Sequence, residues 1–106
     1  MSGANPLRGE ASLIVTGIVR RLRPTFAALV AAEEELGPLF ALVERAGSGG
    51  LRLAEIAALF WHCLTERDGV SREALGDAVV EHGLAACAAP LRTLLAQILK
   101  GAGGHD

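Results

Sequence analysis

The two-strand pattern at residues 10–23 constrains the fold of this chain more than any other feature. Apolar and polar side chains alternate up to Thr16 and Gly17, which suit a two-residue turn, and alternate again as far as Pro24. In a strand, every second side chain lies on the same face. The pattern therefore predicts an antiparallel β-hairpin with its turn at Thr16-Gly17.

This register gives the hairpin two different faces. One face is apolar apart from Arg20 and is predicted to pack against the rest of the protein. The other face carries Arg21 and Arg23, together with Ser12 and Thr16, and is predicted to meet solvent. The apolar members of the inward face are Ala11, Leu13, Val15, Ile18 and Leu22.

The remainder of the chain has the periodicity of amphipathic helices. We therefore predict an α+β fold, a helical bundle of four to five helices with one N-terminal antiparallel hairpin. A length of 106 residues suits a single domain at 1–106, with a helical body at about 25–100. Residues 1–8 and 101–106 are expected to be loosely ordered tails.

Capping residues and breakers predict where the helices begin and end. Thr25 and Ser71 are expected N-caps, and Gly37-Pro38 and Gly83 are expected stops. The predicted helices cover residues 25–36, 39–46, 53–66, 72–82 and 84–100.

Pro90 lies inside the last apolar stripe, which stays in phase across it. One kinked helix is therefore predicted here. The alternative is a new helix with Pro90 at its first position.

Charge and composition indicate a cytoplasmic protein that does not enter membranes. The net charge is −2, but residues 1–25 hold four Arg against one Glu, so positive charge gathers near the hairpin. No apolar run approaches the roughly 20 residues that span a bilayer. The two cysteines lie far apart in the sequence without a ligand-like partner, which is typical of free thiols in a reducing compartment.

No catalytic or metal-binding motif is present in the sequence. The spacing of His62, Cys63, His82 and Cys87 matches no zinc site, and no nucleophile has a base placed to activate it. We expect a protein that is not an enzyme, with no metal, no cofactor and no small-molecule substrate. Nucleic acid is not an expected partner either, because the helix that follows Ser71 is mostly acidic.

The sequence predicts specific contacts for three side chains, which are Arg20, Glu33 and Trp61. The first helix has an expected apolar stripe of Phe26, Leu29, Val30 and Leu36, and Glu33 falls in the middle of it. An inward charge needs a partner, so Glu33 is predicted to form an ion pair with Arg20. Trp61, on the flank of another stripe, is either a core-edge residue or an anchor for a partner.

The order and spacing of several short motifs resemble the small gene transfer agent family of tail proteins. That family is similar to the tail assembly chaperones of long-tailed phages, and the resemblance covers about residues 5–100. The motifs are Asn5-Pro6-Leu7-Arg8-Gly9-Glu10, the strand-turn-strand, Thr25-Phe26-Ala27-Ala28-Leu29, Glu33, Leu36-Gly37, Ala54-Glu55-Ile56, Leu75-Gly76 and His82-Gly83-Leu84.

The resemblance implies a tail-module protein of a gene transfer agent or prophage. Its expected role is that of a tail assembly chaperone, which binds the tape measure protein and delivers the tube subunit to it. A structural tail tube component is the alternative, and a nucleic-acid-associated accessory protein is an alternative of another class. We expect Arg21, Arg23 and Trp61 to contact the partner, and weak self-association is compatible with this role.

Overall fold

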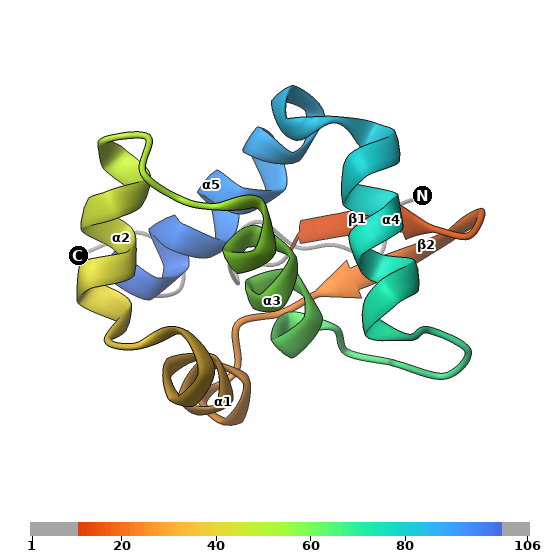
Figure 1. Ribbon diagram of the computed structural model, residues 1–106. Helices are drawn as coiled ribbons and strands as arrows, with labels where there is room; N and C mark the ends of the chain where they lie inside the picture. The colour runs from red at the N-terminus through yellow and green to blue at the C-terminus, as the bar shows by residue number, and fades with distance from the viewer. Residues whose placement is uncertain (1–10, 101–106) are drawn as a thin grey trace.

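The computed structural model describes residues 11–100, in which a two-stranded hairpin precedes five helices (Figure 1). This arrangement confirms the predicted α+β class. The predicted loose tails, 1–8 and 101–106, lie outside the described residues. The elements are β1 (Ala11–Val15), β2 (Ile18–Leu22), α1 (Phe26–Leu36), α2 (Leu39–Gly47), α3 (Leu53–Cys63), α4 (Arg72–His82) and α5 (Leu84–Lys100).

The hairpin has the predicted register. Val15 lies opposite Ile18, and Leu13 lies opposite Arg20. Thr16 has φ 49° and the following glycine has φ 80°, the left-handed conformations that a tight hairpin turn requires. Leu13 and Val15 are buried. Ile18 lies on the same face, opposite Val15, but it is 52% exposed, so its predicted packing against the helices is wrong. Ile18 borders the turn, and the turn projects beyond the helices (Figure 1).

The second strand is also paired at its outer edge. Leu64 forms an antiparallel bridge with Leu22, and the backbone N–H of Arg23 donates to the carbonyl of Cys63 at 2.7 Å. Leu64 adopts the extended conformation that this bridge needs, with φ −60° and ψ 128°. Helix α3 therefore ends at Cys63, and its predicted end at Glu66 is wrong.

Helix α1 buries a different face from the one predicted. Ala28 and Ala32 are the buried residues of α1, whereas Phe26 is 84% exposed and Val30 is 38% exposed. Leu29 of the predicted stripe packs only partly against the core. The small alanine side chains allow close approach of α1 to α3, its main neighbour. Phe26 and Val30 are consequently left at the surface, while Leu29 and Leu36 pack against the edge of the core.

Both predicted N-caps are confirmed. Thr25 Oγ1 accepts a hydrogen bond from the backbone N–H of Ala28 at 3.1 Å, and Ser71 Oγ accepts one from Ala74 at 3.0 Å. Each bond satisfies a backbone donor that the first helical turn leaves without a partner. Gly37 ends α1 with φ 91°, a conformation that suits glycine.

Helix α5 runs without interruption from Leu84 to Lys100, so the prediction of one helix across Pro90 is confirmed. Proline cannot donate to the carbonyl four residues earlier, which belongs to Ala86. Ala86 is exposed, so water can reach that end of the broken hydrogen bond. Cys87 and Leu94 hold the helix to the core from either side of the proline.

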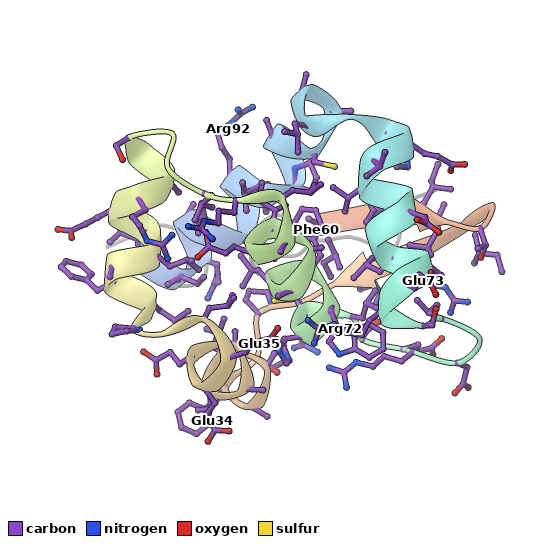
Figure 2. All side chains as sticks on the ribbon, in the orientation of Figure 1. Glu34, Glu35, Phe60, Arg72, Glu73 and Arg92 are labelled. Atoms are coloured by element: carbon purple, nitrogen blue, oxygen red, sulfur yellow. The ribbon has the colours of Figure 1, made fainter. Side chains whose placement is uncertain are left out.

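One hydrophobic cluster joins the hairpin and every described helix. Helix α3 lies in the middle of the molecule, and the fully buried Phe60 occupies its inward face (Figure 2). The largest fully buried side chains are Phe60, Leu22, Leu42, Leu59, Leu75, Leu94, Val15, Val79, Cys63 and Cys87. Both ends of the hairpin's inward face, at Leu22 and Val15, are therefore part of the common core.

We expect the two faces of the hairpin to differ sharply in their contribution to stability. Leu22 is fully buried, so Leu22→Ala should lower the free energy of unfolding by about 2–5 kcal/mol. Val19 is 59% exposed, so Val19→Ala should cost less than about 1 kcal/mol. Urea unfolding followed by circular dichroism measures both. Similar midpoints for the two variants would contradict the observed register.

Candidate partner-binding surface

The outward face of the hairpin carries two exposed aliphatic side chains. Ile14 lies directly opposite Val19 in the sheet, and the two are 46% and 59% exposed. Facing side chains on neighbouring strands contact one another, so Ile14 and Val19 form one apolar patch. Ile18 is also exposed, but it lies on the other face of the hairpin, opposite Val15. Ser12 and Arg21, the next facing pair, border the patch with polar groups.

Two exposed arginines border the patch on the side of β2. The chain near both is anchored by backbone hydrogen bonds: the carbonyl of Arg21 accepts from Thr65 N at 3.1 Å, and Arg23 N donates to Cys63 at 2.7 Å. The side chains of Arg21 and Arg23 are both exposed. We call Ile14, Val19, Arg21 and Arg23 the hairpin surface.

The predicted ion pair between Arg20 and Glu33 is wrong. Arg20 Nη2 donates to the carbonyl oxygen of Asp68 at 3.0 Å, and its buried Nε has no hydrogen-bond partner. Glu33 is exposed, and its Oε2 accepts from the backbone N–H of Leu39 at 3.1 Å. Arg20 therefore ties the hairpin to the α3–α4 loop, while Glu33 binds the start of α2. The prediction failed because it rested on the wrong buried face of α1.

Glu35 is the residue of α1 that forms ion pairs, and sequence reasoning missed it. Its carboxylate accepts two hydrogen bonds from Arg72, at 3.0 and 2.7 Å, and one contact from His62 Nε2 at 2.7 Å. Figure 2 shows Glu35 and Arg72 side by side. A helical wheel could have found Glu35, because it follows Ala28 and Ala32 on their shared face. Glu35 thus links α1 to α3 and α4.

These contacts change the acidity of Glu35. Hydrogen bonds from Arg72, and then from His62, hold the pKa of its carboxyl at about 2, below the usual 4.5. Both donors favour the ionised form, and burial opposes them only weakly. Glu35 therefore stays negatively charged over the whole physiological range.

Trp61 is half-buried at the edge of the same network. The guanidinium carbon of Arg67 lies 4.9 Å from the centre of the indole ring, and that of Arg72 lies 5.7 Å away. Both distances are within the range of cation–π attraction. Arg67 directly precedes Asp68, whose carbonyl binds Arg20, so the ring of Trp61 on α3 contacts the α3–α4 loop to which the hairpin is tied.

The described residues hold no cluster of three or more His, Cys, Asp or Glu side chains that could bind a metal. Burial raises the pKa of the Cys63 thiol to about 12 and also raises that of Cys87. Both thiols are therefore protonated at neutral pH, which makes them poor nucleophiles and poor ligands. Within residues 11–100, no helix combines the length and apolar character needed to cross a membrane.

We expect Glu35→Gln to destabilise the protein in a pH-dependent way. Since the pKa is lowered on folding, the stabilisation is complete above about pH 5 and is lost as the pH falls toward 2. More than a third of the side chain is exposed, so water limits the effect to about 1 kcal/mol. Urea midpoints at pH 7 and pH 3 measure it.

Glu34→Gln is the matched control for this experiment, because Glu34 is exposed on the same helix. At pH 7 the Glu35 variant should unfold at lower urea than the Glu34 variant. The gap should narrow at pH 3. Equal midpoints for both variants at pH 7 would show that the Arg72 and His62 contacts contribute nothing.

Comparison with known proteins identifies the family of the chain. The family described as "Phage tail tube protein, GTA-gp10" matches residues 8–101, almost the entire sequence. No curated protein and no solved structure gives a significant match. The family match confirms the resemblance drawn from the sequence motifs. The chain belongs to this gene transfer agent family of phage tail tube proteins.

Proposed function

We propose that the protein is a tail assembly chaperone that binds the tape measure protein through the hairpin surface. The observation that carries this proposal is the outward exposure of Ile14 and Val19, which face each other on one side of a two-stranded sheet. Buried contacts on the opposite face fix that orientation. An exposed apolar patch bordered by polar groups is typical of a surface that contacts another protein.

The chemistry of the hairpin surface suits an amphipathic helix. Its aliphatic side chains can cover the apolar stripe of such a helix, which would otherwise be exposed to water. Arg21 and Arg23 can attract acidic residues beside that stripe. Apolar contacts should supply most of the affinity, while the two arginines mainly raise the association rate and make it sensitive to salt.

Trp61 is proposed as a further contact beyond the arginines. Its ring is half-buried, so part of the indole remains available to a partner. Arg67 and Arg72 already lie close to the ring, and the Glu35 network restrains Arg72. A large aromatic side chain that is already ordered loses little entropy on binding, which suits an anchor residue.

A structural tail tube component is the second candidate function, and the family description favours it. A structural subunit would use its exposed apolar surface for permanent contacts with neighbouring subunits. A chaperone would instead release its partner after delivery. Both roles place other tail proteins as partners of this chain, but they differ in what the purified protein does alone.

Co-expression with the tape measure protein of the same gene cluster tests the proposal. We expect a co-purifying complex and a higher soluble yield of the tape measure protein. Val19→Glu, which places a charge in the apolar patch, should weaken binding by roughly tenfold or more. Phe40→Glu is the matched control, because Phe40 is 68% exposed on α2, outside the hairpin surface.

Arg21→Gln should mainly slow association at low salt, whereas Arg92→Gln on α5 (Figure 2) should not. Failure to co-purify even at low salt, together with assembly of this protein alone into regular tubes, would replace the chaperone role with the structural one. Equal loss of binding in Val19→Glu and Phe40→Glu would show that the hairpin surface is not the specific binding site for the tape measure protein.

A further inference from the structure

A pocket lies where the link between β2 and α1 meets the end of α3. Its volume is about 280 Å³, and a water molecule takes up about 30 Å³ in the liquid, so the pocket has room for a side chain. The polar residues that line it are Arg23, Thr25, His62 and Thr65, and among the described residues none that lines it is acidic. Because Arg23 also belongs to the hairpin surface, the pocket is continuous with that surface.

Backbone hydrogen bonds hold the wall of this pocket in place. The N–H of Arg23 donates to the carbonyl of Cys63 at 2.7 Å, and the N–H of Thr65 donates to the carbonyl of Arg21 at 3.1 Å. These bonds fasten the end of β2 to the chain that follows α3, so Arg23 and Thr65 keep their relative positions. A pocket that is already formed loses little conformational entropy when a ligand enters it.

The hydrogen-bond donors of the pocket suit a carboxylate. Thr25 Oγ1 accepts from the N–H of Ala28 at 3.1 Å, which leaves the hydroxyl hydrogen of Thr25 to be donated. Thr65 Oγ1 donates to the carbonyl of Arg21 at 3.4 Å, a long bond that a closer, charged acceptor can replace. A guanidinium such as that of Arg23 can bind a carboxylate through two parallel hydrogen bonds.

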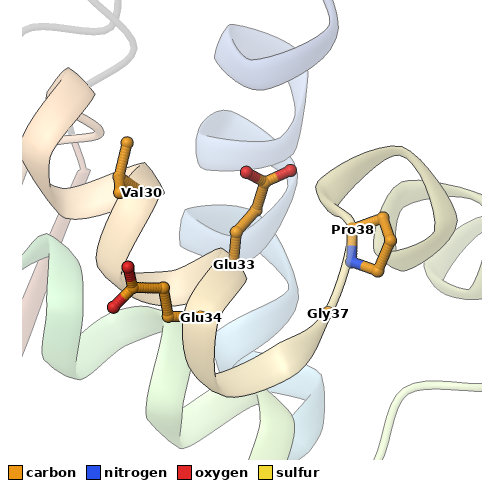
Figure 3. Close-up of a pocket in the computed structure, with 5 residues that line it drawn as sticks. All are labelled: Val30, Glu33, Glu34, Gly37 and Pro38. Atoms are coloured by element: carbon orange, nitrogen blue, oxygen red, sulfur yellow. The ribbon is translucent and has the colours of Figure 1, made fainter.

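A second pocket, at the link between α1 and α2, has the opposite charge (Figure 3). It is lined by Val30, Glu33, Glu34, Gly37 and Pro38. An acidic side chain of a partner is repelled by the two glutamates of this pocket and attracted by the arginine of the other. Charge therefore directs a carboxylate to the pocket beside the hairpin.

We propose that the pocket beside the hairpin binds an Asp or Glu side chain of the protein that covers the hairpin surface. This inference rests on the proposed function and identifies a specific contact within it. Ile14 and Val19 cover the apolar stripe of the partner, and an acidic residue next to that stripe enters the pocket. Arg21 does not line the pocket, so it acts through attraction during association, whereas Arg23 also keeps the partner bound.

The dissociation rate of the complex with the tape measure protein tests this inference. Each variant is co-purified with the tape measure protein, and an excess of labelled wild-type protein is then added to measure the rate of exchange. Thr65→Val removes a hydroxyl without changing the charge, and it should speed dissociation about tenfold, because a hydrogen bond to a charged group is lost. Thr93→Val on α5 is the matched control, since the Thr93 hydroxyl donates to the carbonyl of Ala89 at 3.1 Å and does not line the pocket.

Arg23→Gln should also speed dissociation about tenfold, whereas Arg21→Gln should mainly slow association. Because Arg23 and Thr65 hold the same carboxylate, the double variant should dissociate more slowly than the product of the two single effects predicts. Circular dichroism and urea midpoints check that each variant keeps its fold. Single effects that simply multiply, or a Thr65→Val complex that dissociates at the rate of the Thr93→Val complex, would overturn the inference.

Val19→Glu separates this inference from the proposed function. If Val19→Glu prevents the complex while Arg23→Gln and Thr65→Val dissociate at the wild-type rate, the carboxylate contact fails and the proposed function stands. If Val19→Glu binds normally while both pocket variants dissociate rapidly, the pocket is a contact and the apolar patch is not. A wild type that forms no complex would overturn the proposed function and the carboxylate contact together.

Discussion

Burial of one face of the hairpin against the helices is the constraint on which the rest of the structure depends. Leu13, Val15 and Leu22 join the common core, and Leu64 pairs with the outer edge of β2. Because side chains alternate along a strand, this burial forces Ile14 and Val19 outward. A slip of one residue would exchange the two faces. The exposure of Ile14 and Val19 is therefore a consequence of the register of the hairpin. These two side chains cannot be buried against the helices unless the pairing of the strands is broken.

Local patterns predicted the elements well, because each was determined by neighbours in the sequence. The turn at Thr16-Gly17, the caps at Thr25 and Ser71 and the continuity of α5 all follow from such short-range chemistry. Features set by distant residues were not predictable in this way. The end of α3 depends on a bridge to a strand some 40 residues earlier, and nothing near Glu66 in the sequence indicates it.

The candidate site was predicted only where it lies on the hairpin. Arg21 and Arg23 were assigned to the outward face from alternation alone, and both are exposed. Helix α1 was misread because Phe26 and Val30 were assumed to be inward, whereas close packing on α3 buries its alanines. Because of that error, Glu33 was predicted to be the ion-pairing residue of α1, a role that Glu35 has instead. The same error also concealed the exposure of Phe26 and Val30 on that helix.

A methyl NMR titration with the tape measure protein tests the central claim most directly. Ile14 and Val19 lie on the proposed contact surface, whereas Val15 and Leu22 lie beneath it in the core. On addition of the tape measure protein, we expect the methyl signals of the two surface residues to shift or broaden first, while those of the core residues change little. Unchanged signals from the two surface residues in the presence of a bound tape measure protein would contradict the account.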